Sequence, residues 1–341
     1  MRYPEFLQKN GRIGFIAPSF GAVIEPYRSL FLNGKNRFNQ LGYETVLGPN
    51  CFEDKGIGKS NTPKKCGEEI NDFFINDRSD VIISCGGGET MCEDLPYVDF
   101  EGISKAKPKW YMGYSDNTNL TMLLPTLCDT AAIYGPCAGA FGMEPWHEAI
   151  RDAFSLLCGE KLKMSNYPLW EKESKHEEDF LATYNVTEPY DMRLYGGIDG
   201  KARFTGRLLG GCMDCLTTLC GTKFDRVKEF TESYAEDGIV WFLESCELNP
   251  MSVRRVLWQL DNAGWFNNAK GFIIGRPGCI DADGMGFDRF TAVEGILGKY
   301  NVPIVFDADI GHLPPMIPVI SGALAQVYAY ENSLNIEYML K

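Results

Sequence analysis

The sequence lacks any long apolar run. No stretch approaches the roughly 18 to 20 continuous apolar residues that a membrane-spanning helix requires. Residues 1–12 contain no apolar core of the kind found in secretory signal peptides. Together these absences predict a cytoplasmic protein with no membrane partner. Internal repeats and low-complexity tracts are missing as well.

Positive charge is scarce. The chain has 33 Lys and Arg against 46 Asp and Glu, a formal net charge of −13, and no Lys/Arg-rich run. An acidic surface repels phosphate backbones, so nucleic acid is not an expected partner. Apolar residues make up 45% and charged residues 23% of the chain, as in soluble globular proteins. A length of 341 residues suits two domains better than one.

Strand and helix patterns alternate in the first half. Short apolar runs stop at Pro18, at the glycines after Cys85 and at Gly135, and apolar residues at helical spacing lie between them. Such alternation predicts a parallel sheet with helices on both faces. Ligands of such sheets bind beyond the carboxyl ends of the strands. The expected strands are 12–17, 81–83, 110–112 and 131–134.

The second half repeats this α/β pattern after a different segment. Residues 145–200 are rich in charge and predict a helix followed by a long exposed connection, which could act as a lid. Ile239–Leu243 is a strong strand ending at Glu244, and Asn249 with Pro250 opens a helix. The expected organisation is an N-terminal α/β domain, a connecting segment and a C-terminal domain, over residues 1–150, 151–200 and 201–341.

The segment Gly113–Asn117 is the most informative for chemistry. An apolar strand enters it and a helical pattern leaves it. A sharp turn of this kind presents a serine hydroxyl at the sheet edge, with the following backbone N–H directed at a developing oxyanion. Ser115 is therefore a candidate nucleophile. The alternative is a plain helix cap formed by Ser115 or Asp116.

Histidine is rare, with three in the whole chain. A serine nucleophile needs a general base, and histidine is the usual one near neutral pH. His147 and His176 lie in charged segments that we expect at the surface. His312 lies in a loop stiffened by glycine and proline beyond a predicted strand. It is the candidate base, with a loop-packing role as the alternative.

The base needs a carboxylate to orient it. Glu244 directly follows five apolar residues, and burying a carboxylate without a partner is costly. Asp307 and Asp309 compete for the role because they lie closer to His312 in sequence. The remaining alternative is that Glu244 is a strand-end charge that reaches solvent or pairs with Arg254 or Arg255.

Glycines and cysteines give weaker signals. The turn Gly86–Gly88 follows a strand and could supply an oxyanion N–H, since the phosphate-loop pattern G-x-x-x-x-G-K-[ST] is absent. Twelve cysteines are scattered along the chain, and many lie in apolar runs, where thiols pack as small hydrophobes. Cys212 and Cys215 form a C-x-x-C pair, but a structural zinc site needs two more ligands. We therefore expect buried thiols and no metal.

These motifs together resemble those of the S66 serine peptidases, the family of the LD-carboxypeptidases and the microcin C immunity enzymes. The resemblance extends over nearly the whole chain and keeps the family order. The segments that carry it are Ala17–Ser19, Gly86–Gly87, Leu95–Phe100, Gly113–Thr118, Tyr134–Pro136, Gly206–Gly211, Gly221–Thr222, Phe242–Glu244 and Gly311–His312.

The resemblance implies a flavodoxin-like N-terminal domain, a smaller C-terminal α/β domain and a Ser-His-Glu triad. Ser115 would be the nucleophile, His312 the base and Glu244 the acid, with the backbone N–H groups of Asp116 and Gly87 holding the oxyanion. The implied reaction is amide hydrolysis through an acyl-enzyme, with no cofactor or metal. The resemblance also implies a homodimer.

Departures from the family pattern bear on the substrate. Cys85 replaces an arginine common in LD-carboxypeptidases, and Cys212 replaces a usual asparagine. The chain length resembles the microcin-immunity branch, yet His176 stands where that branch carries a loop tryptophan, for which Trp170 could substitute. A muropeptide tetrapeptide losing its terminal D-Ala, in peptidoglycan recycling, is the expected substrate. An aminoacyl- or peptidyl-nucleotide conjugate, in microcin resistance, is the alternative.

Two other classes stay open. An α/β-hydrolase esterase shares the chain order Ser, Glu, His, but Ser115 lacks the second glycine of that elbow. A non-catalytic nucleotide-binding module would bind nucleotide whether or not Ser115 is present.

Overall fold

The chain divides into two compact units in the computed structural model, which describes residues 1–56, 58–280 and 285–340. The segment 151–200, predicted to connect the two halves, contributes to both. The first unit comprises Met1–Lys161, Glu173–Asn185 and Pro318–Ile320, and the second comprises Leu162–Lys172, Val186–Ile317 and Ser321–Lys341.

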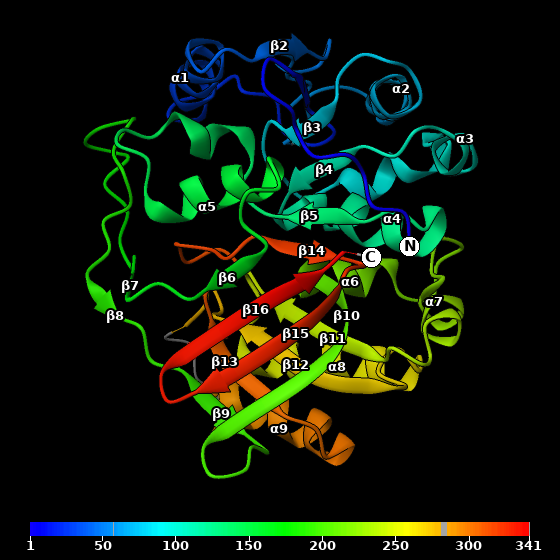
Figure 1. The fold of residues 1–341 in the computed structure, drawn as a ribbon, viewed down its shortest axis with the longest axis vertical. Coiled ribbons are helices and arrows are strands. Elements are labelled where there is room, and N and C mark those ends of the chain that lie inside the picture. Colours follow the sequence, from blue (N-terminus) through cyan, green and yellow to red (C-terminus); the bar gives the residue numbers. More distant parts are fainter. Residues whose placement is uncertain (57, 281–284, 341) are drawn as a thin grey trace. The chain divides into compact units, whose positions relative to one another are not determined.

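A sheet of six strands forms the centre of the first unit. Its strands are Arg12–Ile16 (β1), Glu44–Leu47 (β2), Val81–Ser84 (β3), Trp110–Gly113 (β4), Ala132–Tyr134 (β5) and Val319–Ser321 (β14). The order across the sheet is β14-β5-β4-β3-β1-β2 (Figure 1). Strands β1 to β5 pair in parallel, in the 2-1-3-4-5 order of flavodoxin-like folds. The expected parallel α/β fold is confirmed.

Helices cover both faces of this sheet. On one face Phe15 packs with the rings of Phe31 and Phe38, and on the other Ile16 joins a cluster with Phe73. Consecutive strand residues point to opposite faces, which explains this division. The helices are Tyr27–Gln40 (α1), Pro63–Ile75 (α2), Phe100–Lys105 (α3), Thr118–Cys128 (α4) and Glu148–Leu157 (α5), with short 3₁₀ turns at Met91–Glu93 (η1), Leu95–Tyr97 (η2), Ser115–Asn117 (η3) and Ala138–Gly142 (η4).

A mixed sheet of eight strands forms the centre of the second unit. Its strands are Lys163–Ser165 (β6), Arg193–Tyr195 (β9), Lys201–Cys212 (β10), Ile239–Glu244 (β11), Ala269–Gly275 (β12), Ile304–Ala308 (β13), Leu324–Tyr330 (β15) and Ser333–Met339 (β16). The order is β6-β16-β15-β10-β11-β12-β13-β9, and β10 to β13 run parallel. Leu169–Trp170 (β7) and Glu188–Pro189 (β8) pair separately. Strands β15 and β16 pair antiparallel as a hairpin.

The helices of the second unit include the one predicted after Asn249. The Asn249 side chain accepts a hydrogen bond from the Ser252 N–H at 3.0 Å, and Pro250 occupies the first turn. The helices are Met213–Leu219 (α6), Val227–Ser233 (α7), Pro250–Asn262 (α8) and Arg289–Leu297 (α9), with a 3₁₀ turn at Gly298–Tyr300 (η5). In the first unit, Leu41 is the C-cap of α1 and is 51% exposed.

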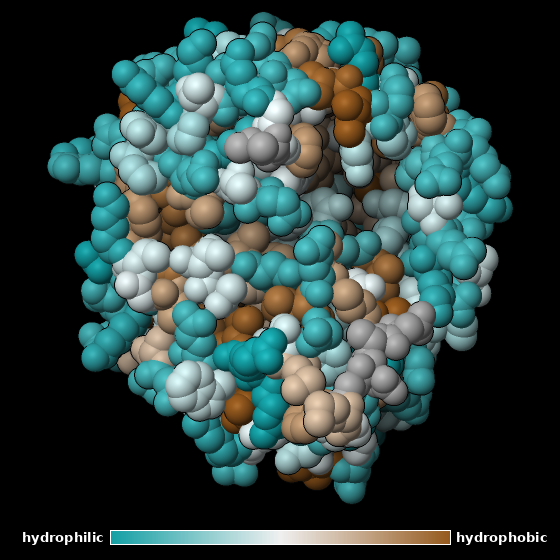
Figure 2. All heavy atoms as spheres, turned by 180° about the vertical axis from the view of Figure 1, so that it is seen from behind, coloured by the Kyte–Doolittle hydropathy of each residue, from teal (hydrophilic) through white to brown (hydrophobic). Residues whose placement is uncertain are grey.

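The surface agrees with the composition. Hydrophilic residues cover most of the face shown in Figure 2, and apolar side chains form small separate groups. Among the described residues, no helix combines the length and the apolar character needed to span a membrane.

Candidate active site

Ser115 lies in the turn between β4 and α4. Tyr114 is extended, with φ −138° and ψ −176°, whereas Ser115 has φ +64°. Residues other than glycine rarely adopt positive φ, and holding one there costs about 1–3 kcal/mol. A strained strand-to-helix turn is the geometry that exposes the nucleophile of α/β hydrolases. The sharp turn expected at residues 113–117 is therefore present.

Neighbouring side chains fix this turn. The Asn117 side-chain amide donates to the carbonyl oxygens of Gly86 and Tyr114, both at 2.9 Å. The Ser115 N–H donates to the hydroxyl of Tyr134, at 3.2 Å. The N-cap position of α4 belongs to Asn117, so the alternative of a plain helix cap by Ser115 or Asp116 does not hold.

The side chain of Asp116 holds the turn in place through hydrogen bonds to two other loops. It is buried, and its carboxylate accepts hydrogen bonds from the Ser19 hydroxyl at 2.5 Å and the Met91 N–H at 3.0 Å. Burial raises the pKa of Asp116, and these hydrogen bonds partly oppose the rise. The carboxylate thus connects the turn to the loops after β1 and β3. Because the side chain is used in this way, the group of Asp116 that could donate to an oxyanion is its backbone N–H.

The glycine turn after β3 lies against Ser115. A Cβ added at Gly87 would lie 3.2 Å from the Ser115 Cβ and 3.3 Å from its Oγ. The Gly87 carbonyl accepts a hydrogen bond from the Phe20 N–H at 3.0 Å, so the loops after β1 and β3 meet here. In the 2-1-3-4-5 strand order, ligands bind at the switch point between β1 and β3. Ser115 and Gly87 lie beside that point.

In the second unit, His312 is bonded to Glu244. The His312 Nδ1 lies 2.9 Å from the Glu244 Oε2. Glu244 ends β11 and is fully buried, and the His312 side chain is 17% exposed. A Cβ at Gly311, where φ is +118°, would lie 2.6 Å from the same Oε2. Only glycine fits at position 311 while the imidazole approaches the carboxylate this closely.

Opposing effects act on the pKa of His312. Burial lowers it, whereas the negative charge of Glu244, the hydrogen bond that its carboxylate accepts from His312 and the interaction with Cys246 raise it, and the net shift is upward. Glu244 therefore stabilises the imidazolium that forms when His312 accepts a proton. This is the role of the acid in a Ser-His-acid triad.

The competing aspartates are engaged by arginines. The Asp309 Oδ1 lies 2.5 Å from an amino group of Arg276, and an oxygen of Asp307 lies 2.8 Å from one of Arg289. Glu244, not the nearer Asp307 or Asp309, is thus the carboxylate hydrogen-bonded to His312.

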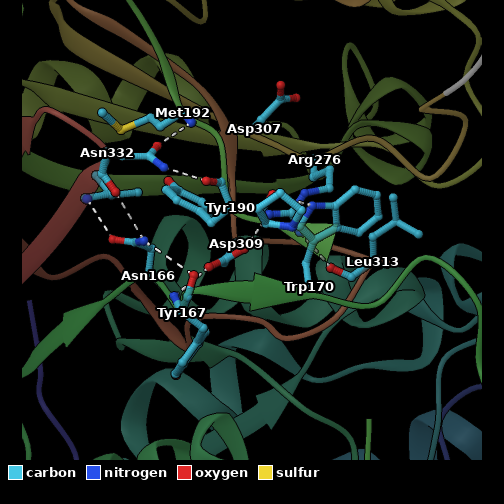
Figure 3. A network of polar contacts seen from close by, with 12 residues as sticks. Asn166, Tyr167, Trp170, Tyr190, Met192, Arg276, Asp307, Asp309, Leu313 and Asn332 are labelled. Atoms are coloured by element: carbon cyan, nitrogen blue, oxygen red, sulfur yellow. Dashed lines mark hydrogen bonds and ion pairs between the residues drawn. The ribbon is translucent and has the colours of Figure 1, made fainter. Parts of the chain in front are cut away.

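The Arg276–Asp309 ion pair is the centre of a buried network (Figure 3). The Arg276 guanidinium lies 4.5 Å from the ring centre of Trp170, and Asp309 accepts a hydrogen bond from the Tyr167 N–H at 2.8 Å. Burial raises the pKa of Asp309 to about 6, and Arg276 opposes this rise. The network braces the loop between β13 and His312.

The other two histidines lie elsewhere. His147 caps α5 by accepting a hydrogen bond from the Ala149 N–H at 3.2 Å, and its ring centre lies 5.4 Å from that of Tyr184. It is half-buried rather than at the surface as expected, and burial lowers its pKa. His176 is also half-buried. Both belong to the first unit.

Cys212 is a further neighbour of the Glu244–His312 pair, which was not expected from the sequence. Cys212 and Glu244 are register partners at the ends of β10 and β11. Ligand atoms of Cys212, Glu244 and His312 all lie within 4.8 Å of one another. The sequence does contain a signal for this contact: two predicted parallel strands end at Cys212 and at Glu244, and the ends of neighbouring parallel strands lie side by side.

The predicted site residues divide between the two units. Ser115, Asp116 and Gly87 belong to the first unit, and Glu244 and His312 belong to the second. The close pairs are Gly87 with Ser115 in one unit and Glu244 with His312 in the other.

Comparison with known proteins identifies the class. The fold and the matched domains are those of a peptidase. Residues 13–135 match the N-terminal domain of the LD-carboxypeptidases and residues 205–327 match their C-terminal domain. The chain belongs to this family, peptidase family S66.

Named relatives cover almost the whole chain. The microcin C7 self-immunity protein MccF of Escherichia coli is 24% identical over 91% of this chain and 88% of its own. A Bacillus subtilis protein named for murein peptide carboxypeptidase activity is 23% identical over 98% of this chain and 94% of its own.

Solved structures share the fold. MccF bound to aspartyl sulfamoyl adenosine has a TM-score of 0.82 at 21% identity, covering 100% of this chain and 99% of that chain. An MccF-like protein of Streptococcus pneumoniae bound to AMP has a TM-score of 0.78 at 22% identity, covering 96% and 99%.

Proposed function

We propose that this protein is a serine-type carboxypeptidase that hydrolyses an amide bond through an acyl-enzyme. Ser115 is the nucleophile, His312 the general base and Glu244 the acid that orients it. The backbone N–H groups of Asp116 and Gly87 hold the oxyanion. The observation that carries the proposal is the positive φ of Ser115 in a strand-to-helix turn, because backbone strain of this kind clusters at active sites.

The proposed mechanism follows acyl-transfer chemistry. His312 removes the proton of the Ser115 hydroxyl, and the oxygen attacks the scissile carbonyl. The resulting oxyanion accepts hydrogen bonds from the two backbone N–H groups. His312 then passes its proton to the leaving amine. Water, activated by the same imidazole, hydrolyses the ester and releases Ser115. Glu244 stays ionised throughout and balances the charge of the imidazolium.

We propose a muropeptide tetrapeptide as the substrate, with release of its terminal D-Ala. The relative named for murein peptide carboxypeptidase activity supports this substrate class. The environment of Trp170 also weighs toward a peptide. Its ring is 9% exposed and packs on Arg276, and its N–H donates to the Pro189 carbonyl at 3.1 Å. A ring held in this way has little free surface on which to stack a nucleotide base.

The second candidate substrate is an aminoacyl- or peptidyl-nucleotide conjugate. It is favoured by the ligands of the structural neighbours, which include aspartyl sulfamoyl adenosine and glutamyl sulfamoyl guanosine. Both substrates offer an amide-type bond to the same nucleophile, so the triad is common to the two proposals.

Mass spectrometry separates these possibilities. Wild type and Ser115→Ala are incubated with a muropeptide tetrapeptide ending in D-Ala and, separately, with aspartyl sulfamoyl adenosine. We expect wild type to release D-Ala and Ser115→Ala to be slower by a factor on the order of 10⁴ or more. Ser104→Ala is the matched control, because Ser104 is a half-buried serine on α3 whose hydroxyl donates to the Glu101 carbonyl.

The outcomes of this experiment distinguish the two substrate classes and test the serine mechanism. If wild type cleaves the adenosine conjugate and not the muropeptide, the substrate is an aminoacyl- or peptidyl-nucleotide conjugate. Equal rates for wild type and Ser115→Ala would overturn the serine mechanism. Light scattering of the purified chain would check the predicted homodimer.

A further inference from the structure

Three side chains that can each bind a metal ion lie close together around the predicted general base, His312. The Cys212 thiol, the Glu244 carboxylate and the His312 imidazole present ligand atoms within 4.8 Å of one another. Cys212 and Glu244 are buried, and the His312 side chain is 17% exposed, so solvent reaches this cluster at the imidazole.

The fold brings the three side chains together for simple reasons. Strands β10 and β11 run parallel, and their register pairs Cys212 with Glu244 at the carboxyl edge. Gly210, two residues before Cys212 on β10, has φ +147°, and a Cβ there would lie 1.8 Å from the Phe242 carbonyl oxygen. The two strand ends thus approach as closely as backbone allows, and the loop after β13 adds His312.

This donor set suits a thiophilic divalent cation. Zn²⁺ is bound in proteins by thiolate sulfur, imidazole nitrogen and carboxylate oxygen, at metal–ligand distances of about 2.0–2.3 Å. Ligand atoms around such an ion are then about 3.3–3.8 Å apart, which small side-chain rotations reach from the present spacing. Mg²⁺ and Ca²⁺ prefer all-oxygen ligands and fit a thiol poorly.

Two more thiols lie beside the cluster. Cys246 is close enough to the His312 side chain, and Cys215 to Cys212, for each to affect the other's electrostatics. Either could act as a fourth ligand after a small movement. A zinc site at the C-x-x-C pair needs two further ligands, and in the folded chain Glu244 and His312 lie beside Cys212 of that pair.

We propose that Cys212, Glu244 and His312 form a binding site for a thiophilic divalent cation such as Zn²⁺, and that the bound ion inhibits hydrolysis. Binding forms metal–sulfur, metal–nitrogen and metal–oxygen bonds. It releases to solvent the thiol proton of Cys212 and any proton on the ligating imidazole nitrogen. No oxidant or reductant takes part.

Inhibition follows from competition for the same atoms. An imidazole that ligates a cation is a poor acceptor for the Ser115 proton, and a carboxylate bound to the cation no longer balances an imidazolium. This second part rests on the proposed function, whereas metal binding itself does not. Zinc would then act as a reversible inhibitor and not as a cofactor.

Binding is tested without substrate. The full chain, reduced and metal-free, is titrated with CdCl₂ while thiolate-to-cadmium charge-transfer absorption is recorded, and with ZnCl₂ by calorimetry. We expect one tight equivalent in wild type. Cys212→Ser should weaken it by more than about 100-fold, beyond the 10- to 100-fold that losing an outer-shell partner costs.

Control variants distinguish this site from weak binding by the other thiols of the chain. Cys220→Ser, at the end of α6 in the same unit, should bind like wild type. His312→Asn should weaken binding while the chain stays folded by circular dichroism, and Cys212→Ala replaces Cys212→Ser if the latter does not fold. Unchanged affinity and absorption in both Cys212 variants would overturn the site.

Activity separates this inference from the proposed function. Ser115→Ala should bind cadmium like wild type although it does not hydrolyse substrate. Added ZnCl₂ should stop wild-type hydrolysis, chelator should restore it, and Cys212→Ser should hydrolyse and resist zinc. Tight binding with undiminished wild-type hydrolysis would refute inhibition alone. Absence of hydrolysis by metal-free wild type would count against the proposed function and leave the binding result intact.

Discussion

The two units hold their predicted site residues by different means. In the first unit, backbone strain and hydrogen bonds position Ser115, those to the buried Asp116 carboxylate included. Ser115 has φ +64°, its N–H is bonded to Tyr134, and the Asn117 amide fixes the turn. In the second unit, buried charges position His312, through Glu244 at 2.9 Å and through the braced Arg276–Asp309 pair nearby. Strain needs only a rigid sheet edge, whereas buried charge needs a complete set of partners. The charge-held unit should therefore suffer most from single substitutions.

The largest effect is expected from Glu244→Gln, which removes the charge beside His312 and keeps its shape. Loss of the triad acid typically lowers kcat by about 10⁴. Steady-state kinetics on the substrate identified by mass spectrometry measures this loss. Asp307→Asn is the matched control, because Asp307 pairs with Arg289, and it should keep activity. Wild-type kcat in Glu244→Gln would mean that charge does not hold this unit's site.

Arg276→Met should lower stability strongly. It leaves the Asp309 carboxylate buried without its cation, and breaking a buried pair from one side costs about 3–5 kcal/mol. Urea denaturation of the two proteins measures the difference. The exposed pair of Arg226 and Glu229 offers the control, since Arg226→Met should change the free energy of unfolding by less than about 1 kcal/mol. Equal effects of the two substitutions would contradict the argument.

In the first unit, Glu69 gives a pH-dependent test. Its carboxyl is 2% exposed and accepts hydrogen bonds from the backbone N–H groups of Ala17 and Asn50, at 2.8 and 2.9 Å. Burial raises its pKa to about 7, against an ordinary value of 4.5. A raised carboxyl pKa means that the folded chain holds the proton more tightly. Its contribution to stability is therefore full below pH 4.5 and is lost as pH rises through 7.

The measurement is the stability of wild type relative to Glu69→Gln at several pH values. The shift corresponds to a loss of up to about 3 kcal/mol across this range. The amide introduced by the substitution cannot titrate, so the stability advantage of wild type over the variant should shrink as pH rises. An advantage that grows with pH would show that the hydrogen bonds to the carboxylate outweigh its burial.

The smallest effect concerns strain. Because glycine adopts positive φ at no steric cost, Ser115→Gly should be more stable than Ser115→Ala by about 1 kcal/mol. Thermal unfolding compares the two. The same pair of substitutions at Ser104, within α3, should favour alanine, since glycine weakens a helix. If alanine is also preferred at position 115, strain does not hold the turn.

Features formed by residues close together in the sequence could be predicted, whereas features formed by residues far apart in the sequence could not. The turn at Gly113–Asn117 and the cap at Asn249 were predictable because neighbouring residues form them. The choice of Glu244 over Asp307 and Asp309 was not settled by spacing, because chain proximity favoured the aspartates. The arginines that engage both are Arg276, 33 residues from Asp309, and Arg289, 18 residues from Asp307.

The amino-acid sequence by itself determined the parallel α/β pattern, the strained serine turn and the family, because each depends on local order along the chain. Only the tertiary structure decided which carboxylate bonds to His312 and that Cys212 joins them. Cys212 and Glu244 lie side by side because of the register of β10 and β11. Gly311 lets the His312 imidazole reach the carboxylate because it has no Cβ, which would collide with Glu244. Register and close approach are set by packing between distant segments, which no local pattern in the sequence encodes.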